Sequence, residues 1–399
     1  MNIKTLFIAL AAVSMSVRAE AQTAKVKDPG YQFTDVKRLP VTSVKNQNRS
    51  GTCWCFSSLS FIEAEVIKAR GIKDENKYPD LSEMFVVRHA YHDRAVSYVR
   101  RDGCMNFAAG SDFGDVFEVI KKYGIVPQSA YSGMNYGTEL PVQGELDAVL
   151  KGYVDAVVKN PNRTLTPVWA NGFDGILDAY LGEVPATFTD NGTTYTPETY
   201  RDALGLNWGD YVGFCSFTHE PYYEPTIIEV ADNWRNSTSY NIPLDDFVAI
   251  VDNAIDNGYT VLWGGDVSEK GFNRDGLGVL IADNQSNTGS DQARWVGNDP
   301  AQKDTTAAKL FTEEEVTPES RQTGYDNKST TDDHGMHLVG SAKDQNGTKY
   351  YIIKNSWGTK SKYEGYWYMS ENFFKAKTLN YVVNKNAIPK DLRKKLGIK

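Results

Sequence analysis

Residues 47–57 have the sequence Gln-Asn-Arg-Ser-Gly-Thr-Cys-Trp-Cys-Phe-Ser, in which turn and capping residues lead into an apolar run. From Cys53 to Arg70 the apolar side chains recur at roughly helical spacing, and Gly71 follows as a stop signal. The pattern predicts a helix whose first turn contains Cys53. A cysteine attacks as the thiolate, and a helix N-terminus stabilises that anion, so we predict a nucleophile at Cys53.

Two distant segments supply partners for such a nucleophile. They are Gly-Met-His at 335–337 and Lys-Asn-Ser-Trp-Gly-Thr at 354–359. His337, at the start of a predicted strand, would pair with the thiolate and later protonate the leaving amine, while Asn355 would hold the imidazole through a hydrogen bond. The side-chain amide of Gln47 would stabilise the oxyanion together with the Cys53 N–H. We therefore predict a thiol hydrolase with catalytic residues Cys53, His337, Asn355 and Gln47.

His334 is a rival for the role of base, since it stands only three residues before His337. It lies in a polar Asp-Asp-His-Gly turn, whereas His337 is followed by the apolar pair Leu338 and Val339. This difference favours His337. A metal site built on the two histidines would need further ligands that the sequence does not mark, so we expect neither a metal nor a cofactor.

These segments resemble the signature of the papain superfamily of cysteine peptidases, with a Cys-Trp at a helix start, a His opening a strand and an Asn-Ser-Trp-Gly turn. In papain-like enzymes the His and Asn follow the Cys by about 130 to 150 residues. Here His337 and Asn355 follow Cys53 by 284 and 302 positions. A long insertion of this kind is similar to the bleomycin hydrolase and aminopeptidase C branch. Further stretches that resemble this branch are Leu-Ser-Glu at 81–83 and the segments 122–127, 259–266 and 364–366.

The resemblance implies an α+β fold of two lobes, a helical L-domain packed on an antiparallel β-barrel R-domain, with the catalytic cleft between them. It also implies peptide substrates, aminopeptidase activity and a homohexamer. Substrate-binding positions by this resemblance are Trp54, Gly110, Ser111, Asp112 and Trp357. At Gly-Ser-Asp, residues 110–112, the chain departs from relatives, which have a Gly-Gly element that pairs with the substrate backbone, and Asp112 would instead contact a substrate amine. Trp54 would form a wall of the cleft, and Trp357 would shield the Asn-His hydrogen bond from water.

Three alternatives to an aminopeptidase remain open on the sequence. In the resembled branch a C-terminal arm places its carboxylate in the cleft, but residues 385–399 are basic and stop short of the familiar arm. An endopeptidase with an open cleft is therefore one alternative. A non-catalytic scaffold or binding protein is the second, and a Cys-His cell-wall amidase is the third, which the Asn-Ser-Trp-Gly context disfavours.

The chain divides by pattern into four parts after a removable leader. Residues 22–130 are mainly helical, 131–240 form the insertion, 241–384 are mainly strands and 385–399 are a basic tail. Helices are predicted at 53–70, at 81–101 with Asp80 as its cap, at 112–123 and at 241–258. Strands are predicted at 259–263, 336–341, 350–354, 365–369 and 379–383, and a polar loop at 283–333.

The composition is that of a globular protein, and the N-terminal pattern predicts export. The 399 residues include 43 Lys and Arg against 51 Asp and Glu, a net charge of −8 that argues against nucleic acid as a partner. An apolar run from Leu6 to Val17 before Ala-Glu-Ala at 19–21 predicts a signal peptide cleaved after Ala21, so we expect a secreted or periplasmic protein without a membrane anchor. Four cysteines are too few to staple the fold, and whether Cys104 and Cys215 pair is left open.

Overall fold

The computed structural model describes residues 30–269, 271–273, 276–281 and 310–399. The predicted leader, residues 1–21, lies outside the described residues, as does much of the predicted loop at 283–333. Within the described part of the chain, no helix is long and apolar enough to cross a membrane.

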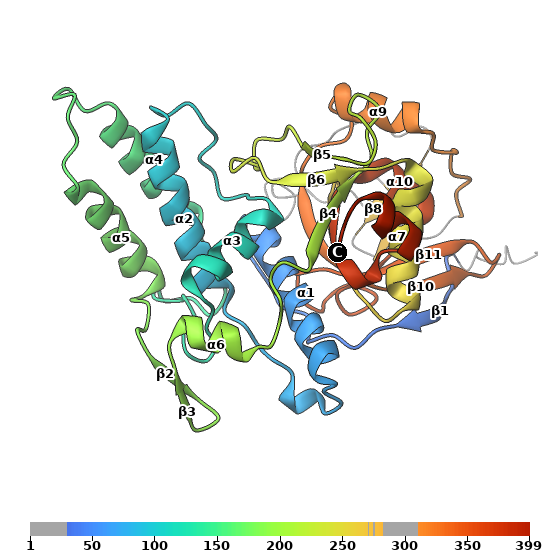
Figure 1. Ribbon diagram of the computed structural model, residues 1–399, viewed down its shortest axis with the longest axis horizontal. Coiled ribbons are helices and arrows are strands. Elements are labelled where there is room, and N and C mark those ends of the chain that lie inside the picture. The colour runs from blue at the N-terminus through green and yellow to red at the C-terminus, as the bar shows by residue number, and fades with distance from the viewer. Residues whose placement is uncertain (1–29, 270, 274–275, 282–309) are drawn as a thin grey trace, which may run out of the picture.

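The molecule has two lobes that meet along one buried helix, α1 (Figure 1). The helical lobe contains α1 (Cys53–Arg70), α2 (Glu83–Arg100), α3 (Phe113–Tyr123), α4 (Gly144–Val158), α5 (Val168–Leu181) and α6 (Pro197–Ala203), with the hairpin β2 (Phe188–Asp190) and β3 (Thr193–Tyr195). Residues Trp54 to Ile67 of α1 are all buried, because the helix packs on α2 and α3 on one side and on strands of the other lobe on the opposite side. Its N-terminus therefore lies at the junction of the lobes.

The second lobe is built on one large sheet. Its described strands are β1 (Phe33–Arg38), β4 (Tyr211–Cys215), β5 (Glu224–Ile227), β6 (Thr238–Asn241), β7 (Val261–Gly265), β8 (Phe272–Asn273), β9 (Leu277–Gly278), β10 (His334–Asp344), β11 (Lys349–Lys354), β12 (Tyr366–Ser370) and β13 (Thr378–Asn384). They pair in the order β5-β6-β4-β13-β7-β10-β11-β12-β9-β8, with β1 also on β10. Helices α7 (Leu244–Asp256), α9 (Pro318–Asp326), α10 (Glu371–Lys377) and α11 (Lys390–Lys395) complete this lobe.

The predicted two-lobed α+β class is confirmed, with one difference in the sheet. The expected barrel was antiparallel, whereas β4–β6 and β9–β12 pair in parallel, so the sheet is mixed. Strand β10 is central, because it pairs with β1, β7 and β11 and also packs against α1. The start of β10 and the start of α1 are thereby held close together.

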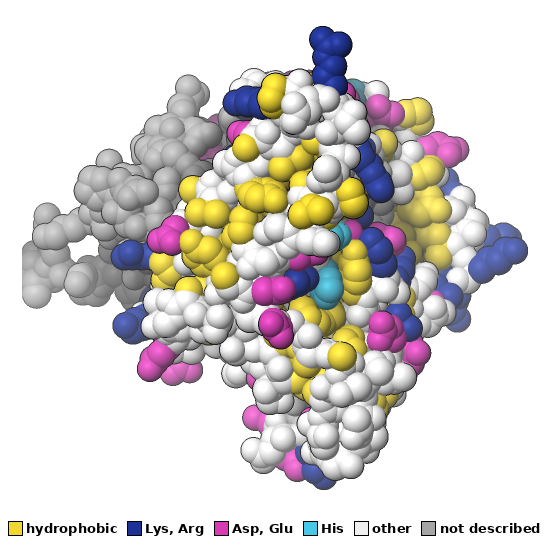
Figure 2. Space-filling view, turned by 90° about the vertical axis from the view of Figure 1, so that its left-hand side faces the viewer, with side chains coloured by type: hydrophobic (Ala, Val, Ile, Leu, Met, Phe, Trp, Pro, Cys, Tyr) yellow, Lys and Arg dark blue, Asp and Glu magenta, His cyan; other side chains and the backbone are white. Residues whose placement is uncertain are grey.

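Residues 131–240 are divided between the two lobes. Helices α4 and α5 pack on α2, and their buried Leu150, Val154 and Phe173 join the hydrophobic core of the helical lobe. Strands β4 to β6 instead extend the large sheet beyond β13. Figure 2, which faces the helical lobe, shows hydrophobic side chains on its outer surface, and the exposed ones in this region include Val149 and Val168.

Several predicted boundaries change in the structure. Helix α2 begins after Ser82, whose hydroxyl accepts the N–H of Phe85 at 3.2 Å, so Ser82 rather than Asp80 is the cap. Helix α9 lies inside the segment predicted to be a loop, and strand β10 begins at His334, two residues earlier than expected. The basic tail forms α11, where Leu392 and Leu396 are buried in the core of the sheet lobe while Lys394 and Lys395 stay exposed.

Candidate active site

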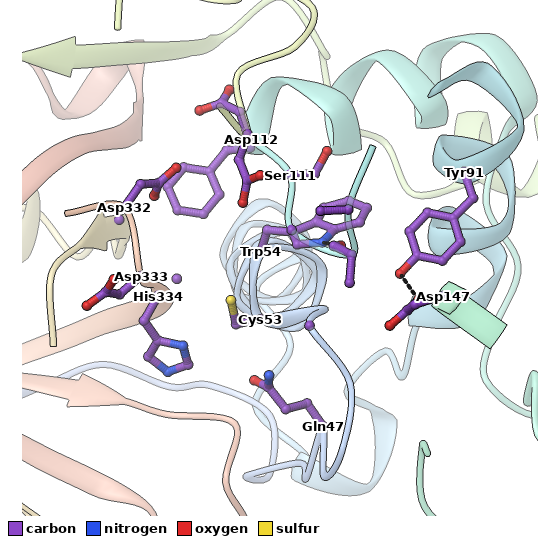
Figure 3. Close-up of a pocket in the computed structure, with 18 of the residues that line it drawn as sticks. Gln47, Cys53, Trp54, Tyr91, Ser111, Asp112, Asp147, Asp332, Asp333 and His334 are labelled. Carbon is purple, nitrogen blue, oxygen red and sulfur yellow. Dashed lines mark hydrogen bonds between the residues drawn. The ribbon is translucent and has the colours of Figure 1, made fainter. Parts of the chain in front are cut away.

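The cleft between the lobes contains Cys53 at the first position of α1. Backbone N–H groups in the first turn of a helix have no acceptor within the helix, and they favour a negative charge at that end. The cleft has a cavity of about 360 Å³, and the helical lobe, the loop before α3 and the start of β10 all contribute to its lining. Figure 3 shows the Cys53 sulfur at the centre, with the His334 ring and the Gln47 side chain facing the same space.

His334 occupies the position expected of the base. Its Nε2 lies 2.7 Å from the Asn355 Oδ1, an atom that also accepts the N–H of Ser356 at 2.7 Å. Because Oδ1 only accepts hydrogen bonds, the proton of a neutral His334 ring is on Nε2, and Nδ1 is the acceptor. Burial lowers the pKa of His334 to about 4, and the hydrogen bond to Asn355 opposes this shift. His334 is thus a neutral imidazole oriented by Asn355.

The prediction that His337 is the partner of Asn355 and Cys53 is wrong. Successive side chains of a strand point to opposite faces, so residues three apart in β10 cannot share a face. His337 points toward the middle of α1, where its Nδ1 lies 2.9 Å from Ser60 Oγ, and its side chain is fully buried. The apolar run after His337, which favoured it in the sequence, continues β10 through the core and says nothing about the cleft.

Gly335 allows the start of β10 to approach α1. A Cβ at this position would lie 2.8 Å from Ser57 Oγ, 3.1 Å from the Phe113 ring and 3.4 Å from the Cys53 carbonyl oxygen. A Cβ would therefore meet its neighbours at closer than ordinary contact distance. The absence of a side chain at Gly335 keeps His334 within reach of the first turn of α1.

Both predicted tryptophans line the cleft. Trp54 is buried, and its indole N–H donates to the Ala109 carbonyl at 3.0 Å, which ties the start of α1 to the loop before α3. Trp357 covers His334, with ring centroids 4.8 Å apart. Trp357 therefore shields the hydrogen bond that Asn355 makes with His334, not one with His337.

Gln47 is held rigidly beside Cys53. Its Oε1 accepts the Ser356 hydroxyl at 2.6 Å, and its Nε2 donates to the Ser50 carbonyl at 2.9 Å. A carboxamide nitrogen carries two hydrogens, so one remains to be directed at a substrate oxygen. The predicted neighbourhood of Gln47 and Cys53 is present in the cleft.

Residues 110–112 form one wall of the cleft, as predicted. A Cβ at Gly110 would lie 1.9 Å from Asp232 Oδ2, so only glycine leaves room for this carboxylate. The Ser111 hydroxyl donates to Asp115 and accepts from Arg94 at 3.0 Å. These hydrogen bonds give the Ser111 side chain a structural role rather than a role in substrate binding. Asp112 caps α3 through the N–H of Gly114 at 2.9 Å and also accepts from Asn380 at 3.1 Å.

Besides Asp147 of α4, four carboxylates from three segments line the cleft, and we call Asp112, Asp232, Asp332 and Asp333 the cleft carboxylates. Sequence reasoning singled out only Asp112, because Asp232 is far away in the chain and residues 332–333 were interpreted as a turn. Burial raises the pKa of Asp112 to about 6 and that of Asp333 to about 7. For Asp332 burial and then the negative charges of Asp232, Asp112 and Asp333 raise the pKa well above its usual range.

The remaining cysteines are free thiols. Cys55 and Cys215 are buried, and Cys104 is exposed, so Cys104 and Cys215 are not paired. The Cys55 sulfur contacts the Glu83 carbonyl oxygen at 3.3 Å on the core side of α1, in agreement with a structural role. In the part of the chain that the structure describes, no group of three His, Cys, Asp or Glu side chains is arranged to hold a metal ion.

Comparisons with known proteins agree with this geometry. Residues 31–159 match the papain family cysteine protease model, and residues 304–398 match the peptidase C1-like family model. The chain is a papain-like cysteine peptidase. It is 24% identical to Aminopeptidase C of Lactobacillus delbrueckii subsp. lactis over 88% of this chain and 81% of that protein. It is 23% identical to Aminopeptidase G of the same organism, over 90% of this chain and 84% of the relative.

The fold of this papain-like peptidase also has a solved counterpart. The crystal structure of PepW from Lactobacillus rhamnosis superposes with a TM-score of 0.65 at 19% identity, covering 91% of this chain and 84% of that one. The similarity extends beyond the two matched ends into described residues between 160 and 281, which neither family model covers. The papain-like fold is therefore shown for both lobes of the described chain.

The assignment of His334, rather than His337, as the base is testable by alkylation of Cys53. We expect His334→Ala to slow the reaction of Cys53 with iodoacetamide at pH 7 about 100-fold, because a positioned base contributes about 10² to 10⁴. Mass spectrometry of the Cys53 peptide measures the rate. Tyr91→Phe, which alters the cleft at a distance from Cys53, is the control and should react at the wild-type rate. An unchanged rate in His334→Ala would mean that another group is the base.

Proposed function

We propose that this papain-like peptidase is an exported aminopeptidase that works through Cys53, His334 and Asn355. The observation that carries the proposal is the hydrogen bond from His334 to Asn355 in the same cleft as Cys53. Asn355 orients the ring, so that Nδ1 is the ring atom left to exchange a proton with the thiol. Gln47 takes the role of oxyanion donor beside the N-terminal amides of α1.

The reaction proceeds in two stages. The Cys53 thiol transfers its proton to His334, and the thiolate attacks the scissile carbonyl while Gln47 stabilises the oxyanion. His334 then protonates the departing amine, which leaves a thioester on Cys53. In the second stage His334 removes a proton from water, the hydroxide cleaves the thioester, and the thiol and a carboxylic acid are released.

Restriction to the N-terminal end of a peptide is supported by the cleft carboxylates. An α-ammonium group near Cys53 would meet several negative charges whose mutual repulsion it relieves, whereas a blocked, neutral N-terminus would not. Asp332 is the foremost candidate for this contact, because it lines the cleft and, among the described residues, receives no hydrogen bond. Asp112, Asp232 and Asp333 each accept hydrogen bonds from neighbouring side chains. The aminopeptidase names of the relatives support the same restriction.

An endopeptidase is the second candidate. In residues 385–398 the tail packs on the sheet lobe through Leu392 and Leu396, and it contributes none of the residues that line the cleft. The device by which the resembled branch restricts cleavage is thus not formed by these residues. The distinction therefore depends on whether the cleft carboxylates replace it.

Paired peptides decide between the two activities. We expect wild-type protein to hydrolyse a peptide with a free N-terminus with a kcat/KM at least tenfold higher than its N-acetylated twin, because the ammonium contributes a charged hydrogen bond of about 1.5 to 3 kcal/mol. Cys53→Ala should abolish both activities while leaving the circular dichroism spectrum unchanged. Equal rates for the two peptides would establish an endopeptidase, and activity of Cys53→Ala would overturn the nucleophile.

The cleft carboxylates predict a pH dependence confined to free-amine substrates. As pH falls below about 7, carboxyl groups with raised pKa values, such as Asp333 at about 7 and Asp112 at about 6, take up protons and lose their attraction for the ammonium. KM for the free peptide should rise, while KM for its acetylated twin should not.

The same attraction predicts the effect of removing one carboxyl group, because an ammonium bound beside Asp332 would favour the charged form of that carboxyl. Asp332→Asn should raise KM for the free peptide about tenfold at pH 7.5 and leave the acetylated peptide unaffected. Asp391→Asn, on the exposed face of α11, is the matched control and should behave as wild type. If Asp332→Asn slows both peptides equally, Asp332 does not recognise the amine.

Export and assembly complete the proposal. Residues 1–21 have the pattern of a signal peptide, so the protein released from a bacterial host that carries the full gene should begin at Gln22 when its N-terminus is sequenced. An N-terminus at Met1 in the soluble cytoplasmic fraction would contradict export.

We also propose that the mature protein is a homo-oligomer, a hexamer by family resemblance. The exposed apolar side chains Val149 and Val168 on the helical lobe are consistent with a buried interface.

A further inference from the structure

A second, much smaller cavity lies behind the His334–Asn355 pair, on the side of the site away from substrate. It holds about 10 Å³ of free space, which is close to the minimum for one water molecule. Its polar lining includes Lys45, Ser60, Glu83, His337, Lys354 and Asn355. Asn355 is therefore the residue that connects this buried polar cavity to the hydrogen bond with His334.

The hydrogen bonds of Ser60 fix the proton of His337. Ser60 Oγ accepts from the Lys354 ammonium at 2.8 Å and lies 2.9 Å from His337 Nδ1. Lys354 can only donate, and among the described residues the Ser60 hydroxyl hydrogen has no acceptor other than Nδ1, so we assign Nδ1 as the acceptor. Burial, followed by the charge of Lys354, lowers the pKa of His337 well below its ordinary value, so the ring is neutral. A neutral ring that accepts at Nδ1 carries its proton at Nε2.

Two donors around this cavity have no hydrogen-bond partner among the described residues. His337 Nε2 and Asn355 Nδ2 are both buried and, among the described side chains, both lack a hydrogen bond. Each is an N–H donor, so they cannot satisfy one another. A buried donor without an acceptor costs about 1 to 3 kcal/mol, which makes two such donors at one cavity a strong indication of a bound acceptor.

We propose that one buried water links His337 Nε2 to Asn355 Nδ2 and that His337 is thereby a positioning residue for the catalytic His334–Asn355 pair. The inference rests on the proposed function of that pair. A water oxygen accepts two hydrogen bonds and so satisfies both donors, and its own hydrogens have an acceptor in Glu83, which lines the same cavity. Water suits the charges better than an anion, since the ammonium of Lys45 is already paired with Glu83 at 2.7 Å and Glu63 at 3.7 Å.

The proposed link matters because a carboxamide group can rotate so that its oxygen and nitrogen exchange positions. Exchange of Oδ1 and Nδ2 of Asn355 would present a donor to His334 Nε2, which is itself a donor, and would lose the 2.7 Å hydrogen bond. An acceptor at Nδ2 makes the turned form unfavourable. The orientation of His334 thus depends, through Asn355 and the proposed water, on His337, on Ser60 in the middle of α1 and on Lys354 of β11.

The test compares two substitutions of His337. His337→Leu removes the Nε2 donor and should lower kcat about fivefold, the rate equivalent of one neutral hydrogen bond, with KM unchanged. The alkaline limb of the pH profile for Cys53 alkylation should move to lower pH by about 0.7 unit, the logarithm of the same factor, because a less well oriented Asn355 supports protonated His334 less. His337→Gln retains a donor and should restore both values to within about twofold of wild type.

A histidine of α2 provides the matched control. His89 packs against Phe85 and Tyr123 away from the cleft, so His89→Leu makes the same chemical change without touching Asn355. Its kcat and pH profile should equal those of wild type. The proposal is overturned if His337→Leu also equals wild type, or if His337→Gln is as slow as His337→Leu, since the side chain would then serve packing alone.

A crystal structure of the wild-type protein tests the water directly. One water within about 3.2 Å of both His337 Nε2 and Asn355 Nδ2 is expected, and a dry cavity would overturn the proposal even if His337→Leu failed to fold. Failure of the proposed function gives a different result. A protein that hydrolysed no peptide would contradict the aminopeptidase, yet the alkylation profile of Cys53 would still report whether His337 supports the His334–Asn355 pair.

Discussion

The site depends on the close approach of the start of β10 to the first turn of α1. Gly335 makes this contact, with room for a hydrogen but not for a methyl group between it and the Ser57 hydroxyl. On one side of the contact is Cys53, whose position on α1 is fixed by a helix buried along most of its length. On the other is His334, which pairs with Gly265 of β7 at the start of β10. Neither lobe alone contains the reactive pair.

The charges of the site are arranged in two layers. The cleft carboxylates face the cavity, where their crowding favours a cationic ligand, and among the described residues no Lys or Arg lines the cavity beside them. Behind Asn355 the Lys45 ammonium pairs with Glu63 and Glu83, and the buried Lys354 ammonium donates to Ser60. Between the two layers lie His334 and Asn355, which are both buried, and Trp357 covers the His334 ring. This separation keeps the histidine neutral and ordered next to a strongly acidic cleft.

Sequence patterns predicted the elements that are regular and locally encoded. Helix α1 was predicted with both of its ends, and α3 and α7 were predicted to within a few residues, because apolar spacing and caps are local signals. Residues 131–240 were not predicted, since α4 and α5 are stabilised by packing on α2 and β4 to β6 by pairing with β13. Those contacts join positions far apart in the chain, and no local pattern records them.

The sequence by itself indicated the chemistry that we propose, through Cys53 at a helix start, Asn355 before Ser-Trp-Gly and Gln47 ahead of the cysteine. The resemblance drawn from these motifs extended to the papain-like fold. Only the tertiary structure decided between His334 and His337, because the choice depends on which face of β10 meets Asn355. It alone gathered Asp232 with Asp112 and residues 332–333. Motifs specify which groups can react, whereas strand register and lobe packing specify which of them meet.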